Sequence, residues 1–297
     1  CCGKSAFDSN YIIKLMSGKE RIKSQESRVT NQESKIKIGK LESKLSIGFS
    51  PCPNDTFMFD AMIHDKVDTE GLSFVVAITD VEDLNNKALA SELDITKLSY
   101  HAYAFVNKDY VLLNAGSALG YSCGPILIAN SNIQHPTSNI NNLMIAIPGR
   151  YTTANFLLGL YAAEEFNKVE MHFSKIEDAV LNGAVDAGVI IHENRFTYEQ
   201  KGLQKIVDLG EYWEELTGSP IPLGGIAAKR SLPSETLHKI NRVLRRSIEY
   251  AFANPKSGIE FIRKHSQKMR EEVMYKHIDL YVNKYSLDLG SEGRRAV

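Results

Sequence analysis

From residue 45 onward, short apolar runs alternate with amphipathic segments, which predicts strands that alternate with helices. Strands are expected at residues 45–49, 72–78, 93–100, 110–114, 125–129, 143–147, 169–173, 188–191, 205–209 and 220–229. Helices are expected at residues 57–64, 81–91, 100–106, 154–166, 176–181, 210–218, 233–252, 255–265 and 271–281. Such alternation favours parallel sheets covered by helices.

Two segments interrupt this alternation: a polar, turn-rich one at residues 130–142 and a proline- and glycine-rich one at residues 220–225. We interpret each as a crossing between two lobes. This predicts a first lobe at residues 45–130 and 222–297 and a second lobe at residues 131–221. The predicted fold is α/β and two-lobed, and its layout resembles the type II periplasmic-binding-protein fold. Ligands favour the cleft between two such lobes.

Residues 1–44 differ in composition from the rest, because after a brief apolar patch they are rich in Lys, Glu, Ser and Gln. Such a segment buries too little apolar surface to offset the entropy cost of ordering, so we expect a disordered extension. Its origin stays open between an upstream translated extension and the tether of a lipoprotein acylated at Cys1. At the other end, residues 287–297 lack a clear helix stop, and the sequence leaves open whether the chain is truncated there.

The composition is that of an ordinary globular protein: 43% of the 297 residues are hydrophobic, 24% are charged and the formal net charge is −1. This balance gives no general attraction to nucleic acid or to an anionic membrane, so neither is an expected partner. No apolar stretch approaches the ~20 residues that span a bilayer. The four cysteines form no C-x-x-C pair and have no metal-ligand spacing with histidine. None of these features indicates an oligomeric state.

The candidate general base is His192, which directly follows the apolar strand at residues 188–191. In an open α/β sheet, ligands bind at the carboxyl ends of the strands. An imidazole there titrates near neutral pH and can take a proton from a substrate. Glu193 is a rival base, or it orients His192. The alternative is that His192 is a polar strand end whose imidazole is satisfied by the next loop.

The loop Ser50-Pro-Cys-Pro-Asn-Asp-Thr56 joins the first strand to a helix. Its two prolines argue against helix before Asn54, so Asn54 or Asp55 is the predicted N-cap. A rigid loop leading into a capped helix exposes free N–H groups, which predicts an anion site. Cys52 has the chemistry of a nucleophile, but no neighbour in the sequence activates it, and we favour a structural thiol.

Two further segments carry polar groups toward the expected cleft. Lys97 and Ser99 lie at the end of the third predicted strand, although Ser99 could equally cap the helix that follows. Thr152 or Thr153 is predicted to cap the helix at residues 154–166, and a cap alone would explain both threonines.

Five segments occur in an order and at separations typical of one known family. They are Ser50-Pro-Cys-Pro-Asn-Asp-Thr-Phe57, Thr96-Lys-Leu-Ser-Tyr100, Pro148-Gly-Arg-Tyr-Thr-Thr153, Ile190-Ile-His-Glu-Asn-Arg-Phe-Thr-Tyr198 and Pro220-Ile-Pro-Leu-Gly-Gly225. Over residues 45–297 the chain resembles the 1,4-dihydroxy-6-naphthoate synthase family of the futalosine route to menaquinone. Any one motif is weak, whereas five in order are specific. The resemblance implies the two-lobed fold, a cytoplasmic location and no redox or metal cofactor.

The resemblance also implies a reaction. Such an enzyme opens the cyclic dehypoxanthine form of futalosine, a small-molecule carboxylate, to 1,4-dihydroxy-6-naphthoate and releases a sugar-derived fragment. His192 would be the general base of this carbon–carbon lyase. The implied substrate-binding positions are Lys97, Leu98, Ser99, Thr152 and Thr153, with Asn54 added from the loop before the first helix.

Two other functions stay open. A solute-binding protein that captures a small carboxylate without turnover has the same fold, since fold does not fix function, but it needs no histidine at the cleft. A chorismate dehydratase, the sister enzyme of the pathway, shares the fold but not the Ser-Pro-Cys-Pro-Asn-Asp loop. The remaining histidines have no supporting motif, and only structural roles are expected for His64, His101, His135, His172, His238, His265 and His277.

Overall fold

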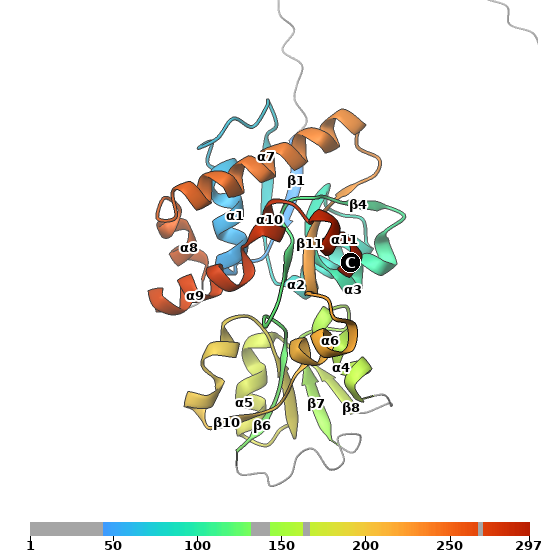
Figure 1. Ribbon diagram of the computed structural model, residues 1–297, viewed down its shortest axis with the longest axis vertical. Coiled ribbons are helices and arrows are strands. Elements are labelled where there is room, and N and C mark those ends of the chain that lie inside the picture. The colour runs from blue at the N-terminus through green and yellow to red at the C-terminus, as the bar shows by residue number, and fades with distance from the viewer. Residues whose placement is uncertain (1–43, 132–142, 163–166, 267–269) are drawn as a thin grey trace, which may run out of the picture. The chain divides into compact units, whose positions relative to one another are not determined.

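The protein is described by a computed structural model (Figure 1). The described residues are 44–131, 143–162, 167–266 and 270–297. Apart from Lys44, the predicted extension at residues 1–44 lies outside them. Most of the predicted crossing at residues 130–142 and the end of the helix predicted to reach residue 166 also lie outside them.

The first sheet has six strands. They are β1 (Leu45–Phe49), β2 (Phe74–Ile78), β3 (Ile95–Ser99), β4 (Tyr110–Leu112), β5 (Ala118–Gly120) and β11 (Ile221–Lys229). Their order is β2-β1-β3-β11-β4, with β5 paired to β11. β1 runs parallel to β2 and β3, whereas β11 is antiparallel to β3, β4 and β5. This sheet is therefore mixed, not purely parallel as the alternation predicted.

The second sheet has five strands. They are β6 (Ile126–Asn130), β7 (Met144–Ile147), β8 (Asn167–Glu170), β9 (Ala187–Ile190) and β10 (Leu203–Asp208). Their order is β10-β6-β9-β7-β8, so β9 is the central strand. β9 is parallel to β7 but antiparallel to β6. The apolar run before His192 is thus a buried central strand, as predicted, in a mixed sheet.

The position of β6 corrects one predicted boundary. The prediction assigned residues 45–130 to the first lobe, but β6 pairs with β9 and β10 of the second sheet. The crossing therefore lies between β5 and β6. The error has a local cause: β5 is only three residues long, and its glycine- and serine-rich surroundings predicted a loop.

Helices cover both sheets. They are α1 (Pro53–Ile63), α2 (Val81–Leu89), α3 (Tyr100–Val106), α4 (Thr153–Ala162), α5 (Ile176–Leu181), α6 (Leu209–Thr217), α7 (Ser234–Ala253), α8 (Ile259–His265), α9 (Glu271–Tyr281), α10 (Lys284–Leu287) and α11 (Gly290–Ala296). Short 3-10 turns, η3 (Phe173–Lys175), η4 (His192–Phe196) and η5 (Tyr198–Lys201), lie on either side of β9 in the sequence. In Figure 1, α1 and α7 to α9 lie with the first sheet and α4 to α6 with the second.

The start of α1 differs from the prediction. The helix begins at Pro53, and Cys52 is the N-cap residue without a side-chain cap bond. Proline is tolerated at the first helical position, because the N–H that it lacks would have no partner there. Asn54 and Asp55 therefore lie inside the first turn and do not cap the helix.

Packing against α7 fixes α1 on the first sheet. The rings of Phe49 and Phe59 stack with centroids 4.4 Å apart. Ser247 on α7 is fully buried, donates to the Met58 carbonyl at 2.6 Å and accepts from the Met62 N–H at 3.1 Å. A buried hydroxyl with both partners made specifies one alignment of the two helices. The start of α1 is thereby held at the carboxyl end of β1.

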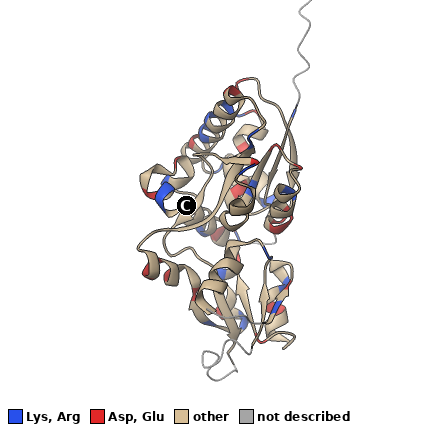
Figure 2. Ribbon diagram, turned by 90° about the vertical axis from the view of Figure 1, so that its right-hand side faces the viewer, with Lys and Arg blue, Asp and Glu red and all other residues tan. Residues whose placement is uncertain are grey.

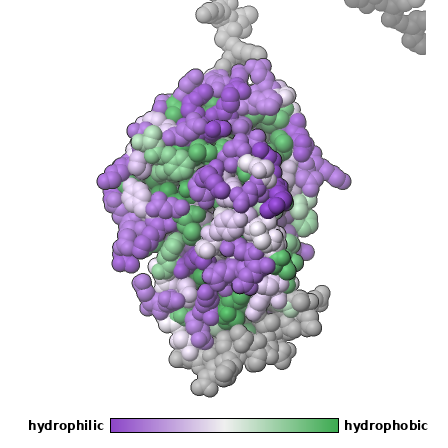
Figure 3. All heavy atoms as spheres, in the orientation of Figure 1, coloured by the Kyte–Doolittle hydropathy of each residue, from purple (hydrophilic) through white to green (hydrophobic). Residues whose placement is uncertain are grey.

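Acidic and basic residues are interspersed over the ribbon in Figure 2, and hydrophobic and hydrophilic side chains are mixed on the face in Figure 3. Arg242 and Arg246 on α7 both pair with Glu70, for example. No helix within the described ranges is long and apolar enough to cross a membrane.

Candidate active site

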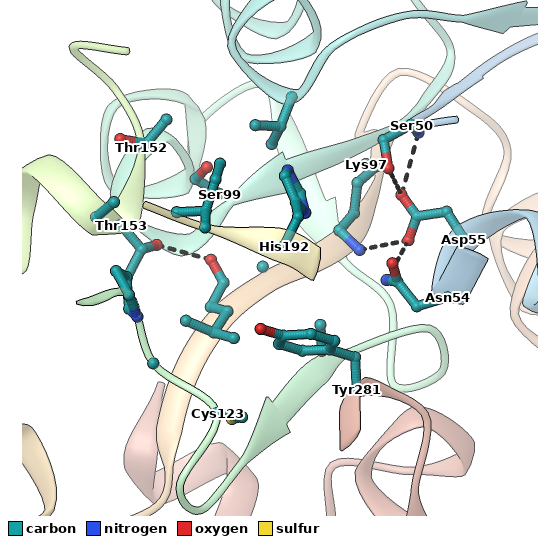
Figure 4. Close-up of a pocket in the computed structure, with 18 of the residues that line it drawn as sticks. Ser50, Asn54, Asp55, Lys97, Ser99, Cys123, Thr152, Thr153, His192 and Tyr281 are labelled. Carbon is teal, nitrogen blue, oxygen red and sulfur yellow. Dashed lines mark hydrogen bonds and ion pairs between the residues drawn. The ribbon is translucent and has the colours of Figure 1, made fainter. Parts of the chain in front are cut away.

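A cavity of about 90 Å³ lies where the carboxyl ends of β1, β3 and β9 approach the starts of α1 and α4 (Figure 4). Strand residues of the first sheet and loop and helix-start residues next to the second sheet line it, and His277 and Tyr281 of α9 line it as well. A water needs roughly 10–15 Å³ by this measure, so the cavity holds several waters or a small ligand. It brings together five of the predicted substrate-binding residues and the predicted base: Asn54, Lys97, Ser99, Thr152, Thr153 and His192.

His192 is the first residue of η4, two positions after the end of β9, and has a backbone φ of 60°. This left-handed conformation is uncommon outside glycine, and such residues cluster at functional sites. The imidazole is half-buried, and the ring of Phe173 meets it edge-on with centroids 4.8 Å apart. Burial lowers the pKa of His192, against the opposing effect of the Glu193, Asp80 and Asp55 charges. The imidazole is therefore neutral at pH 7 and can accept a proton.

Cys52 is the nearest sulfur to this imidazole. Its Sγ lies 3.4 Å from Nδ1 of His192 and 3.8 Å from Nε2. No residue adjacent in the sequence activates Cys52, and the fold adds a contact with a histidine 140 positions away. Burial, followed by the charge of Glu193, raises the pKa of Cys52 well above its usual value. The side chain is thus a neutral thiol, which supports the structural interpretation.

Lys97 and Asp55 form a buried ion pair beside His192. The Lys97 ammonium donates to Asp55 Oδ1 at 2.7 Å, and the Asp55 side chain is fully buried. Asp55 also accepts from Ser50 N at 3.1 Å, Ser50 Oγ at 2.7 Å and Asn54 Nδ2 at 2.9 Å. The anion site predicted at this loop is therefore occupied by the protein's own carboxylate. Figure 4 shows Lys97 reaching along the cavity to Asp55.

The side chains of Ser99 and Leu98, at the end of β3, face opposite sides of the strand. Ser99 accepts a hydrogen bond from Asn85 Nδ2 at 3.1 Å, makes no cap bond to α3 and keeps its own hydroxyl proton for a ligand. The Leu98 side chain is fully buried in a cluster with Val106 and Tyr110. The structure therefore does not bring Leu98 to the cavity, because alternate residues of a strand face opposite sides.

Thr152 and Thr153 use their hydroxyl protons inside the protein. Thr152 Oγ1 donates to the Gly149 carbonyl at 2.7 Å and accepts from Asn155 N at 3.2 Å, which makes it the predicted cap. Thr153 Oγ1 donates to the Leu223 carbonyl on β11 at 2.7 Å. Thr153 and Ala154 line the cavity where α4 begins. The first N–H groups of a helix have no intrahelical partner, so they can bind an anionic group.

Helix α9 also contributes to the cavity, and nothing in the sequence reasoning had predicted this. His277 and Tyr281 both line the cavity, and their rings are 4.6 Å apart between centroids. Their spacing of four residues places them on one helix face, which is the signal that could have found them. Within the described ranges, no three His, Cys, Asp or Glu side chains gather as a metal site would require.

The fold and the site define a class of protein: a two-lobed α/β protein of the periplasmic-binding-protein fold with a histidine in its cleft. The structure resembles the alkanesulfonate-binding protein SsuA from Xanthomonas axonopodis pv. citri with a TM-score of 0.61 at 13% identity, covering 80% of this chain and 84% of that one. At that identity the likeness concerns the fold alone. A crystal structure of a protein from Archaeoglobus fulgidus has a TM-score of 0.80 at 40% identity, covering 85% and 93% of the two chains.

A profile of the family described as menaquinone biosynthesis matches residues 45–297. A curated relative from Thermus thermophilus, named 1,4-dihydroxy-6-naphthoate synthase, is 47% identical over 253 residues, or 85% of this chain and 91% of the relative. One of the same name from Streptomyces coelicolor is 40% identical over 258 residues, or 85% and 90%. The chain therefore belongs to the menaquinone biosynthesis family, a family of enzymes, and the resemblance drawn from the five motifs is confirmed.

Proposed function

We propose that the chain is the lyase that converts cyclic dehypoxanthine futalosine to 1,4-dihydroxy-6-naphthoate, with His192 as the general base. The observation that carries the proposal is the position of His192: a neutral imidazole in a left-handed turn, at the end of the central strand and on the cavity wall. A pure solute binder needs no such group.

The proposed chemistry requires removal of a proton from carbon as the ring becomes aromatic. A correctly placed general base typically contributes about 10²–10⁴-fold to such a step. His192 suits this role because burial keeps it unprotonated near neutral pH. Glu193 is not among the residues that line the cavity, which favours His192 over the rival base.

The polar groups around His192 suit a carboxylate ligand that also carries hydroxyls. The start of α4 offers N–H groups and the positive end of the helix dipole to a carboxylate. Lys97 gives one of its three N–H donors to Asp55, which leaves two for a ligand. Ser99 adds a hydroxyl donor on the opposite sheet. Closing of the cleft around the ligand would exclude water and align the C–H bond with His192.

The test is direct turnover. The purified chain is incubated with cyclic dehypoxanthine futalosine and a metal chelator, and 1,4-dihydroxy-6-naphthoate is followed by mass. Formation of the product without added cofactor is the expected result. The proposal includes a cytoplasmic location, which follows from the family resemblance and is tested separately by fractionation of cells.

Two outcomes would overturn the proposal. Tight binding of the substrate by a folded sample without any product would favour the solute-binding function. A parallel reaction with chorismate tests the sister activity, because a dehydratase would release a product lighter by one water. We expect chorismate to remain unchanged.

A further inference from the structure

His277 is a second imidazole at the cavity, and the proposed reaction has no role for it so far. It lies on α9, is 1% exposed, and its ring centroid is 6.2 Å from that of His192. Histidine is a costly choice for a purely structural position inside a protein, because both ring nitrogens need partners. Among the described residues, only one of the two ring nitrogens of His277 has a partner.

The hydrogen bonds around His277 fix its tautomer. The Asp55 carboxylate forms an ion pair with Lys97, so it has no proton to donate. Its hydrogen bond with Asn54 must therefore be one that Asp55 accepts. The amide nitrogen of Asn54 must therefore face Asp55, and its Oδ1 faces Nε2 of His277 at 3.0 Å. A carbonyl oxygen only accepts, so Nε2 of His277 carries the proton. Nδ1 is then left with a lone pair and no proton.

This Nδ1 atom is buried and has no hydrogen-bond partner among the described residues. Buried polar atoms in native proteins are almost always satisfied, and an exception calls for an unseen water or ligand. Burial lowers the pKa of His277 well below its usual value, and the charge of Lys97 acts in the same direction. The ring therefore stays neutral, and Nδ1 remains an acceptor throughout the working pH range.

We propose that His277 is a ligand-binding residue whose Nδ1 accepts a hydrogen bond from one ring hydroxyl of the product, 1,4-dihydroxy-6-naphthoate. The inference rests on the proposed function for the identity of the ligand. An acceptor excludes the carboxylate as its partner, since a carboxylate only accepts, and selects an O–H donor. His277 thus distinguishes hydroxylated rings from unhydroxylated ones, while the start of α4 holds the carboxylate.

The chain offers a matched pair of variants. In His277→Gln the amide nitrogen can replace Nε2 and keep the bond to Asn54, but the acceptor at Nδ1 is lost. In His277→Asn the amide oxygen can replace Nδ1, but the bond to Asn54 is lost. A purely structural role predicts that Gln is the better substitute, because it keeps the one bond that is made. The proposed role predicts that Asn is the better substitute for ligand binding.

Calorimetry then measures the Kd of 1,4-dihydroxy-6-naphthoate and of the two monohydroxy naphthoates that each lack one hydroxyl. For the wild type we expect removal of one particular hydroxyl to weaken binding about tenfold, the size of one hydrogen bond. In His277→Gln, removal of the same hydroxyl from the ligand should weaken binding less than about twofold, because this variant already lacks the acceptor at Nδ1. His277→Asn should retain most of the tenfold effect.

A measurement on the wild type removes the dependence on folded variants. Nitrogen-15 NMR of histidine side chains reports which ring nitrogen is protonated. We expect unprotonated Nδ1 and protonated Nε2 at His277, and a shift of the Nδ1 signal when 1,4-dihydroxy-6-naphthoate is added. The monohydroxy analogue that lacks the relevant hydroxyl should not move that signal.

The outcomes separate this inference from the proposed function. If the wild type forms product but His277→Gln keeps the full hydroxyl effect, or if Nδ1 does not respond to the ligand, a water satisfies Nδ1 and the inference is wrong. If the wild type neither forms product nor binds the naphthoate, the proposed function fails and the inference fails with it.

Discussion

The Sγ atom of Cys52 lies 3.4 Å from Nδ1 of His192, although the two residues follow strands of different sheets and are 140 positions apart. A cysteine and a histidine at this distance are the parts of a nucleophilic pair. The protonation states argue against that use. The pKa of Cys52 is raised and that of His192 is lowered, so the pair is a neutral thiol beside a neutral imidazole. Such a contact positions the ring and does not activate the sulfur.

We therefore expect Cys52→Ala to lower kcat by less than about tenfold, the size of one orienting hydrogen bond. Alkylation of the wild type by iodoacetamide should be slow at pH 7, because the thiolate is the reactive form. Product formation measures kcat of Cys52→Ala, and the mass of the wild type during iodoacetamide treatment measures the rate of alkylation. A loss in Cys52→Ala as large as that in His192→Ala would instead make the thiol part of the chemistry.

His192→Ala should lower turnover by about 10²–10⁴-fold while the Kd of the product changes only a few-fold, since a general base acts mainly in the transition state. Steady-state kinetics and calorimetry separate the two effects. His238→Ala is the matched control, because His238 is exposed on α7 and does not line the cavity. Activity of His192→Ala within a few-fold of wild type would refute the assignment of the base.

The negative charge of Glu193 affects how kcat/KM depends on pH, and the direction of the effect follows from its attraction to a protonated His192. A base must be unprotonated, so kcat/KM should rise with pH through the pKa of His192 and level off above it. Burial places this rise below the usual value of 6.5. The Glu193 charge raises the pKa of His192, so Glu193→Gln should move the rise to lower pH with little change in the plateau. A collapse of the plateau in Glu193→Gln would identify Glu193 as the base.

The sequence predicted those parts of the site that follow from local patterns. His192 follows an apolar run, and a polar residue that ends a buried central strand reaches a cleft by sheet geometry alone. The contacts of Cys52 with His192 and of His277 with Asn54 join residues distant in the sequence, so no local pattern could predict them. The packing of α9 onto the site, which brings His277 to Asn54, depends on the tertiary fold, and the sequence shows only that His277 and Tyr281 share one helix face. The Leu98 position was carried over from the family, but strand alternation turns its side chain into the core.

Deletion of residues 1–44 should leave kcat/KM unchanged and the Tm within about 2 °C, because the family match and β1 both begin at residue 45. A longer deletion that also removes residues 45–49 is the control. β1 lies between β2 and β3, so its loss should abolish cooperative unfolding. Thermal denaturation and product formation measure both variants. A large drop in the Tm of the shorter deletion would mean that the extension packs on the fold.

The ion pair between Lys97 and Asp55 determines how much positive charge the cavity presents to an anionic ligand. Both side chains are buried, and their atoms are 2.7 Å apart. Removal of one partner leaves the other charge buried and unpaired, which typically costs about 3–5 kcal/mol. Lys97→Met and Asp55→Asn should each destabilise the protein by roughly this amount in urea unfolding.

The double variant tests the coupling. Lys97→Met with Asp55→Asn should cost clearly less than the sum of the single changes, since it leaves no unpaired charge. Additive effects within about 0.5 kcal/mol would mean that Lys97 is stabilised by something other than Asp55. The substrate affinity of the double variant then tests a second point, the role of Lys97 in ligand binding. The stability of this variant should be largely restored, so a remaining loss of substrate affinity would measure the contribution of the two Lys97 N–H donors that we propose for the ligand.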